Sequence, residues 1–236
     1  MRLEVLYQDD HLIAIDKPPG IHVHPTHLSK GEDSCMRILR DQIGQWVYPV
    51  HRLDRATSGV LLFALDKDSA AKTMQQFIDR KIKKRYWAVV RGYVSSEINI
   101  NHPLKEEPHK PPADATTIVK PLAKVELPFP IGSFTTARYS LVEANPVTGR
   151  KNQVRKHFVH ISHPIVGDVR YGDGKHNRLF REQFSIKRLL LMAMGIELIQ
   201  PATDNTISIK APLPDAVKTL FLRIGWESFL DNKTAI

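Results

Sequence analysis

The sequence lacks the features that stabilise secreted proteins or anchor membrane proteins. Its single cysteine, Cys35, excludes an intramolecular disulfide and fits a reducing cytoplasm. Residues 1–10 lack the apolar run of a signal peptide, and no later apolar stretch approaches the roughly 20 residues needed to span a bilayer. We therefore expect a cytoplasmic protein with no membrane partner.

The sequence shows no internal repeat, and we expect no appended small domain. The 236 residues, 42% of them hydrophobic, can bury a substantial core. Acidic residues are the scarcer charge, with 25 Asp and Glu against 34 Lys and Arg, a formal charge of +9. The electric field of a positively charged protein attracts polyanions, which favours a nucleic-acid partner. The alternative is a basic protein that has no specific nucleic-acid partner.

Short strand-like and helix-like segments are mixed along the chain, which predicts an α+β fold. Strands are predicted over residues 3–7, 12–16, 59–65, 85–90, 136–144, 189–199 and 206–210. Helices are predicted over residues 34–43 with Asp33 as the cap, 69–82 with an apolar face of Ala70, Met74, Phe77 and Ile78, 152–161 and 215–224. Residues 101–112, rich in Pro, Lys and Glu, are predicted to form a surface loop.

Residues 51–59 carry the most informative pattern. Asp54 lies between Arg52 and Arg55 on a polar loop that leads directly into an apolar strand. Loops of this kind present side chains on a rigid support, and flanking arginines favour an ionised carboxylate that can act as a nucleophile or stabilise positive charge at a sugar carbon. The alternative for Asp54 is a turn residue paired with a surface arginine.

A dense run of cations precedes an aromatic pair in the middle of the chain. Tyr86 follows this run, so a phosphate-attracting patch borders a ring that can stack on a base. The alternatives are a solvated helix end for the cations and a core position for Tyr86. The cations of this run are Arg80, Lys81, Lys83, Lys84 and Arg85.

A third cluster starts at the turn of residues 145–149 and continues into a predicted helix. Arg150 and Lys151 lie near the beginning of this helix, where its dipole also favours anions. Arg155, within two turns of the start, can bind a carboxylate with both arms of its guanidinium. The alternative is a surface helix whose arginines take no part in catalysis or binding.

These segments resemble four motifs of the RluA-type pseudouridine synthases, in the same order along the chain. The matching segments are residues 16–25, residues 51–59, residues 84–88 and residues 148–168. The resemblance implies a single catalytic domain over residues 1–236, with a mixed, largely antiparallel sheet, flanking helices and a catalytic cleft across the sheet. It implies no S4-type RNA-binding domain and no cofactor or metal.

The same resemblance implies a role for individual residues. Asp54 matches the catalytic aspartate, Tyr86 the tyrosine that stacks on the base, and Arg155 the arginine that pairs with the aspartate. Arg52 matches the arginine that fills the space vacated in the RNA, and Val154 an apolar position against the flipped base. The sequence departs from the family at residues 55–56, which replace a more usual acidic or lysine pair, and at residue 152, an asparagine where many members have histidine.

The substrate implied by the resemblance is RNA. The motif at residues 148–168 is similar to that of a branch of the family that acts on uridine 65 of tRNA, so we expect a monomeric tRNA enzyme. A ribosomal RNA enzyme of the same family and a non-catalytic RNA-binding or RNA-folding protein are the alternatives. A metal enzyme is a further alternative because of two groups of histidines, which are His22, His24 and His27, and His157, His160 and His163.

Overall fold

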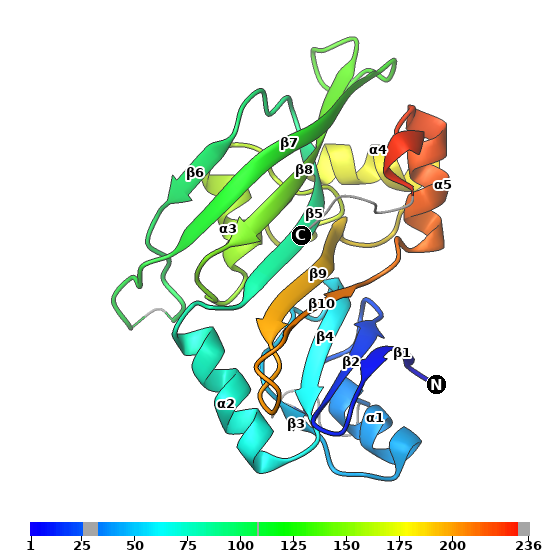
Figure 1. The fold of residues 1–236 in the computed structure, drawn as a ribbon. Helices are drawn as coiled ribbons and strands as arrows, with labels where there is room; N and C mark the ends of the chain where they lie inside the picture. Colours follow the sequence, from blue (N-terminus) through cyan, green and yellow to red (C-terminus); the bar gives the residue numbers. More distant parts are fainter. Residues whose placement is uncertain (26–32, 108, 231–236) are drawn as a thin grey trace. The chain divides into compact units, whose positions relative to one another are not determined.

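The computed structural model describes residues 1–25, 33–107 and 109–230 (Figure 1). The chain forms two compact units. The first comprises Met1–Lys84 and Ala193–Ala211, and the second comprises Arg85–Met192 and the described residues from Pro212 onward. His27 of the metal hypothesis lies outside the described residues.

The first unit contains a sheet in which the strands predicted over residues 3–7 and 12–16 pair with each other. Its strands follow the order β1-β2-β4-β9, with β10 pairing β9 and β3 pairing β4. The pairs β1–β2, β2–β4, β3–β4 and β9–β10 are antiparallel. The strands are β1 (Glu4–Gln8), β2 (Leu12–Lys17), β3 (Tyr48–Pro49), β4 (Ser58–Ala64), β9 (Leu191–Ile199) and β10 (Thr206–Lys210).

Two helices of the first unit begin or end differently from the prediction. Helix α1 (Cys35–Ile43) is capped by Ser34, whose side chain accepts from the N–H of Arg37, and not by Asp33. Helix α2 (Lys67–Ile78) begins after Asp66, which accepts from the N–H of Ser69, and it ends four residues before Ile82. The predicted end was wrong because the chain turns at Arg80 in a left-handed conformation, with φ of 58°.

The predicted apolar face of α2 was also partly wrong. Ala70 is buried, but Met74 and Ile78 are 42% and 71% exposed. The helix instead buries Ser69 and Thr73, small polar residues that sequence periodicity does not count as core. Ile82 is buried beyond the helix, in the same core cluster as Leu62 and Ala70.

The second unit contains a sheet in the order β5-β8-β7-β6, antiparallel in every pair described (Figure 1). The strands are β5 (Lys83–Arg91), β6 (Ile98–Asn101), β7 (Thr116–Leu127) and β8 (Ala137–Pro146). The helices are α3 (Gln153–His160), α4 (Gly174–Phe184), α5 (Asp215–Ile224) and the short 3-10 helix η1 (Glu227–Phe229). The sequence prediction missed β3, β6, β7 and α4.

Side chains from strand and helix pack together in the core of the second unit. Trp87 and Tyr139 are buried on β5 and β8, and the rings of Tyr139 and Phe180 meet edge to face at 4.8 Å between centroids. Phe158 of α3 is also fully buried. Together the two units confirm the predicted α+β composition with largely antiparallel strands.

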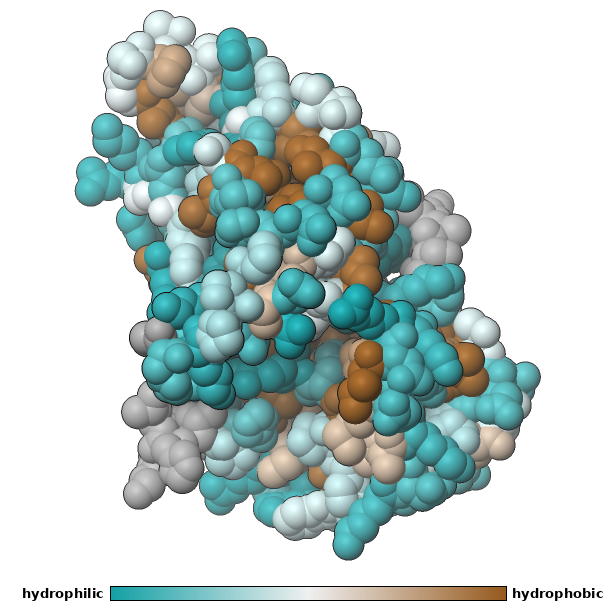
Figure 2. Space-filling view, turned by 90° about the vertical axis from the view of Figure 1, so that its left-hand side faces the viewer, coloured by the Kyte–Doolittle hydropathy of each residue, from teal (hydrophilic) through white to brown (hydrophobic). Residues whose placement is uncertain are grey.

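One face of the molecule, drawn in Figure 2, is mostly hydrophilic. Hydrophobic residues reach this face in several separate groups, between hydrophilic ones. Individual large apolar side chains are exposed elsewhere along the chain, among them Trp46, Phe134 and Val169. Isolated exposures of this kind are normal for a folded protein, so they need no partner to explain them.

Candidate active site

Asp54 occupies a short loop between β3 and β4 in the first unit. We call residues 51–57 the Asp54 loop. The N–H of Thr57 donates to the carbonyl of Asp54 at 3.0 Å, which closes a turn immediately before β4. Leu53 and Thr57 are buried, whereas Asp54 is partly exposed and Arg52 is exposed. Buried neighbours therefore fix the loop, while Asp54 itself stays partly exposed.

Lys17 binds the backbone of the Asp54 loop. Its side chain is fully buried at the end of β2, and its Nζ donates to the carbonyls of Pro18, Arg55 and Thr57 at 2.9, 3.1 and 2.8 Å. A buried ammonium group is costly unless such acceptors surround it. Sequence reasoning missed this role, although a lysine that ends the apolar strand 12–16 is a visible signal.

The segment after Lys17 adds two further bonds to the same loop. The N–H of Gly20 donates to the carbonyl of Arg55 at 2.7 Å, and the Nε of Arg55 donates back to the carbonyl of Gly20 at 2.8 Å. Gly20 has φ of 92°, a conformation that favours glycine. The residues at 17–20 and the Asp54 loop thus form one hydrogen-bonded frame.

His51 ties the beginning of the Asp54 loop to β4. Its Nε2 accepts from the N–H of Leu62 at 2.9 Å, and its ring stacks on Phe77 with 5.0 Å between centroids. Burial, together with the nearby charge of Lys84, lowers the pKa of His51 to about 3. The imidazole is therefore neutral at physiological pH, with the acceptor at Nε2.

Two histidines of the metal hypothesis, His157 and His163, have hydrogen-bond partners within the protein. His157 bonds through its two ring nitrogens to Thr117 Oγ1 and the carbonyl of His102, and Nδ1 of His163 bonds to the carbonyl of Arg91. Among the residues that the structure describes, no three His, Cys, Asp or Glu side chains are grouped so that they could hold a metal ion. The described histidines therefore do not form the site that this hypothesis requires.

The cationic run does not form one uniform patch. Lys81 and Lys83 are exposed, and they lie 3.4 and 2.6 Å from the carboxylates of Asp79 and Glu197. Arg80 is also exposed, at its left-handed turn. These three residues keep the accessibility that binding to a phosphate backbone requires.

The last two cations of the run are placed differently. Burial lowers the pKa of Lys84 to about 8. Arg85 is 2% exposed, lies 4.0 Å from Glu143, and places its guanidinium 6.0 Å from the ring centroid of Trp87. This burial does not fit the predicted contact of Arg85 with an RNA backbone, because β5 has already begun at Lys83 and alternate residues of a strand face the core.

Tyr86 lies on β5 opposite Ala144 of β8. It is partly exposed, whereas its neighbours Arg85 and Trp87 are buried. Successive side chains of a strand point to opposite faces, so Tyr86 faces away from the core that holds Trp87. The core position that we gave as the alternative for Tyr86 is therefore occupied by Trp87, and Tyr86 lies outside this core.

Arg155 is held by a carboxylate that sequence reasoning had not paired with it. Its Nε donates to Oδ2 of Asp168 at 2.7 Å and its Nη2 donates to Oδ1 at 2.8 Å. Its Nη1 donates to Oδ1 of Asn152 at 2.8 Å. Val154, beside it on α3, is 7% exposed. The signal that could have pointed to Asp168 is its place in the segment of residues 148–168, which also contains Arg155.

The start of α3 is stabilised by side chains and not by Asn152, which has φ of 56° and makes no cap of its own. Gln153 accepts from the N–H of Arg150 and the hydroxyl of Thr148. Arg150 donates through Nε to the carbonyl of Asp114, and Lys151 is exposed. Several polar groups at the helix start, which we predicted as an anion site, are therefore hydrogen-bonded within the protein.

The N–H of Lys151 has an acidic partner from the predicted surface loop. It donates to Oε1 of Glu106 at 2.8 Å, and the Nζ of Lys156 donates to the carbonyl of Lys105 at 2.7 Å. An isolated bridge between Leu104 and Ala113 closes this segment. The described residues of 101–112 are therefore attached to α3.

The predicted site residues divide between the units. Asp54 and Arg52 belong to the first unit, whereas Tyr86, Val154 and Arg155 belong to the second. The second unit brings Arg155 together with Asn152 and Asp168. The pairing of Asp54 with Arg155 stays a prediction.

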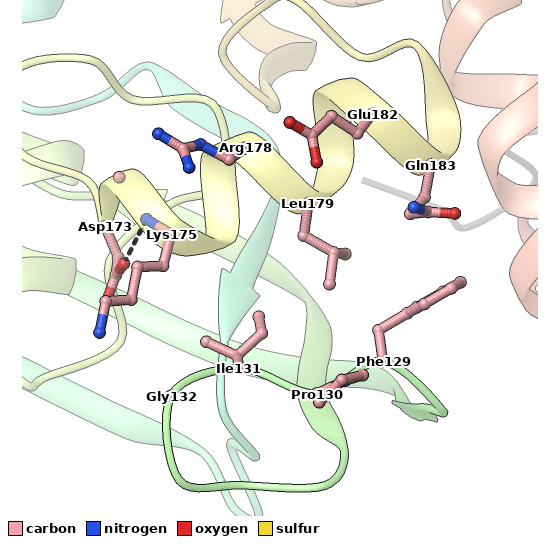
Figure 3. A pocket seen from close by; sticks show the side chains of 11 residues that line it. Phe129, Pro130, Ile131, Gly132, Asp173, Lys175, Arg178, Leu179, Glu182 and Gln183 are labelled. Atoms are coloured by element: carbon pink, nitrogen blue, oxygen red, sulfur yellow. Dashed lines mark hydrogen bonds between the residues drawn. The ribbon is translucent and has the colours of Figure 1, made fainter.

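A separate pocket lies between α4 and the turn that follows β7 (Figure 3). Ile131 and Leu179 point toward one another across it, with Phe129 and Pro130 beside them. Asp173 at its edge binds Arg91 at 2.7 Å and caps α4. None of the predicted site residues lines this pocket, and Asp173, one of its two acidic residues with Glu182, is engaged in these structural bonds.

Comparison with known proteins gives a consistent result. Residues 11–160 match the family model described as RNA pseudouridylate synthase. Among curated relatives, "tRNA pseudouridine synthase C" of Vibrio cholerae is 47% identical, with 98% of this chain and 99% of the relative covered. The protein of the same name from Vibrio parahaemolyticus is 45% identical, with 98% of both chains covered, and that of Haemophilus influenzae is 44% identical, with 96% and 99% covered.

Two solved structures share the fold. Human RNA Pseudouridylate Synthase Domain Containing 1 superposes with a TM-score of 0.72 at 24% identity, covering 90% of this chain and 84% of that one. Human RNA Pseudouridylate Synthase Domain Containing 4 has a TM-score of 0.66 at 24% identity, with 93% and 92% covered. These likenesses confirm the predicted pseudouridine synthase fold.

Over the part of the chain that the structure describes, the helices are too short or too polar to cross a membrane. The family match covers β2, the Asp54 loop, β5 and α3, which are the elements that carry the predicted site. The chain belongs to the RNA pseudouridylate synthase family and is an enzyme that isomerises uridine to pseudouridine.

Proposed function

We propose that this enzyme converts a uridine of tRNA to pseudouridine, with uridine 65 as the first candidate. The observation that supports tRNA is the identity of 44–47% to relatives named for tRNA, over nearly the full length of both chains. The motif of residues 148–168 supports uridine 65. We further propose that the protein works as a cytoplasmic monomer with one catalytic domain over residues 1–236.

Asp54 is proposed as the catalytic carboxylate. The reaction detaches uracil from its N1 link and reattaches it through C5, so no atom or electron is added and no cofactor is required. A carboxylate held against the nucleotide is required. The Asp54 loop supports this role because Lys17, Gly20 and His51 fix its backbone while Asp54 remains partly exposed.

Arg155 is proposed to orient Asp54, and Val154 to contact the base beside it. Arginine binds a carboxylate through two parallel hydrogen bonds, which fixes the plane of the carboxylate as well as its position. The buried guanidinium of Arg155 is itself fixed in this way by Asp168.

The remaining residues are proposed to bind RNA. A uridine within a stem must leave the stack at a cost of a few kcal/mol, which Arg52 can offset by filling the vacated space. Tyr86 would stack on the extruded base, a contact worth about 1–3 kcal/mol in comparable sites. The backbone contacts are assigned to the exposed cations Arg80, Lys81, Lys83 and Lys151, and to Arg150, which is partly exposed. Lys84, with its lowered pKa, is a weaker candidate, and Arg85 is withdrawn because it is buried.

The test is pseudouridine formation on defined RNAs. Purified enzyme would be incubated with unmodified tRNA and with ribosomal RNA fragments that carry 5-tritiated uridine, and tritium release would be followed. Mapping of the tRNA product would identify the modified position. We expect release from tRNA and modification at position 65. Efficient release from a ribosomal fragment with every tRNA unmodified would contradict the tRNA assignment and leave the reaction class intact.

A further inference from the structure

Two aspartates of the second unit bind arginines at the same distance but in different surroundings. Asp168 lies 2.7 Å from Arg155, and their side chains are 1% and 10% exposed. Asp173 lies 2.7 Å from Arg91, and their side chains are 27% and 36% exposed. The first pair is therefore buried, whereas the second is partly exposed to solvent.

The carboxylate of Asp168 is fixed from several sides. Oδ1 accepts from the backbone N–H groups of Arg170 and Tyr171 at 2.9 and 3.0 Å as well as from Arg155. Burial opposes ionisation of Asp168, but the hydrogen bonds from Arg155 and from the N–H of Tyr171 outweigh it, so the pKa of Asp168 is lower than usual. The carboxylate is thus an ionised acceptor that cannot rotate without breaking bonds to the backbone.

The backbone of Asp168 is fixed as well. Its carbonyl accepts from the N–H of Gly172 at 3.0 Å and from Nδ2 of Asn177 at 2.9 Å. Gly172 has no room for a side chain, because a Cβ there would lie 2.2 Å from that same carbonyl. Asp168 is therefore a rigid support and not a mobile surface acid.

The guanidinium of Arg155 is held on its other sides by Asn152 and Tyr171. Oδ1 of Asn152 accepts from Nη1, and the ring centroid of Tyr171 lies 5.0 Å from the guanidinium carbon. Nδ2 of Asn152 donates to the Tyr171 hydroxyl at 3.3 Å, so the two supporting side chains also hold each other. Nε and Nη2 donate to Asp168 and Nη1 donates to Asn152, so all three nitrogens are held and the guanidinium plane is fixed.

We propose that Asp168 is a positioning residue for the isomerisation, acting through Arg155. This inference rests on the proposed function, in which Arg155 orients Asp54. The bidentate pair with Asp168 sets the plane in which Arg155 presents its guanidinium. Because Asp168 balances the charge of Arg155, Arg155 directs Asp54 without cancelling the negative charge that the chemistry needs.

The main variant is Asp168→Asn, which keeps the volume and removes the charge and one acceptor. We expect kcat for tRNA to fall on the order of 100-fold, the cost of a misplaced group, while KM stays within about twofold. The matched control is Asp173→Asn, since Asp173 also accepts from an arginine and from two backbone N–H groups. The control breaks a partly exposed pair, so it should lose less stability than Asp168→Asn, and it should keep kcat within about twofold of wild type.

Two further variants separate positioning from a general loss of structure. Arg155→Lys keeps the cation beside Asp168 but loses the two-point contact, so it should reproduce the fall in kcat even if Asp168→Asn folds poorly. In an Arg155→Ala background, Asp168→Asn should cause no further loss in single-turnover rate, because its effect passes through Arg155.

The possible outcomes are distinguishable. A folded Asp168→Asn enzyme with kcat within twofold of wild type overturns the inference. It is also overturned if the single-turnover rate of the double variant falls by the product of the two single effects, because Asp168 would then act independently of Arg155. An inactive Arg155→Ala enzyme with active Asp168→Asn enzyme overturns the role of Asp168 alone. Arg155→Ala enzyme with full activity instead overturns the proposed role of Arg155, and the role of Asp168 fails with it.

Discussion

Nε2 of His51 accepts a hydrogen bond of 2.9 Å from the backbone N–H of Leu62, which joins the Asp54 loop to the strand that follows it. Protonation would place an N–H where this acceptor is needed, in a buried setting that already disfavours the charge. The two effects agree with the low pKa of His51, about 3 against an ordinary value of 6.5.

This difference predicts how stability depends on pH. Between pH 6.5 and 3 the unfolded chain binds a proton at His51 and the folded chain does not, so the free energy of unfolding should fall as pH falls through this window. The contribution is at most about 1.4 kcal/mol per pH unit. Denaturant titrations at pH 7.5 and pH 5 would be compared for wild type and His51→Gln, whose amide oxygen can accept the same bond. The gap between the two proteins should change with pH, and a constant gap would contradict the prediction.

Asp54→Asn tests the catalytic carboxylate directly. The substitution nearly preserves volume and removes the charge, so folding and RNA binding should persist while pseudouridine formation falls below detection. A folded variant that kept a tenth of wild-type turnover, a barrier increase of only about 1.4 kcal/mol, would show that Asp54 is not essential. Asp10→Asn, in the exposed turn between β1 and β2, is the control and should remain fully active.

Gly59→Ala should destabilise the protein. Gly59 has φ of 107°, and a Cβ there would lie 2.1 Å from the carbonyl oxygen of Ala193 in the neighbouring strand β9. We expect a loss of about 2 kcal/mol or more in the free energy of unfolding, from backbone strain and displacement of β9 together. Gly174→Ala is the control, because nothing lies within 4 Å of its Cβ and alanine favours the helix that it begins. An equal loss in both variants would show that the contact with Ala193 is not the cause.

RNA affinity should fall steeply with salt, and two cations of the same run should behave differently. Lys81→Gln should weaken RNA binding and reduce the slope of log K against log salt by about 1, the signature of one phosphate contact. Arg85→Gln should leave the slope unchanged and lower the melting temperature, because Arg85 is 2% exposed and lies beside Glu143 and Trp87. The slopes would be measured by filter binding between 50 and 200 mM salt, a range over which such contacts change affinity by orders of magnitude. A change of slope in Arg85→Gln alone would reverse the assignment.

The sequence predicted the elements whose pattern is local. Continuous apolar strands such as β4 and the helix α5 are found within a residue or two of their expected ends, because burial on both faces and a glycine at residue 225 mark them clearly. The strand β7 was missed because it contains Pro121 and buries only Thr117, Val119 and Leu127, so its sequence shows no regular alternation. Helix α4 was missed because it buries only Leu179 and Phe180.

The candidate site shows the same limit. Asp54, Tyr86 and Arg155 stand out through charge and motif spacing, but their supports act through the backbone or across long separations. Lys17 reaches the loop through carbonyls, which have no sequence signature. Asp168 binds Arg155 across 13 positions, a pairing that only the folding of residues 161–168 against α3 creates.

The frame around the Asp54 loop separates the loop's shape from its side chains. Lys17 and the N–H of Gly20 bind backbone carbonyls, and every residue type at positions 55 and 57 provides the same carbonyl. Substitutions there would keep these carbonyl bonds, although a substitution of Arg55 would lose the bond from its Nε to the carbonyl of Gly20. We therefore expect substitutions at residues 55–57 to change the contacts that the loop can offer to the RNA more than they change the path of its backbone.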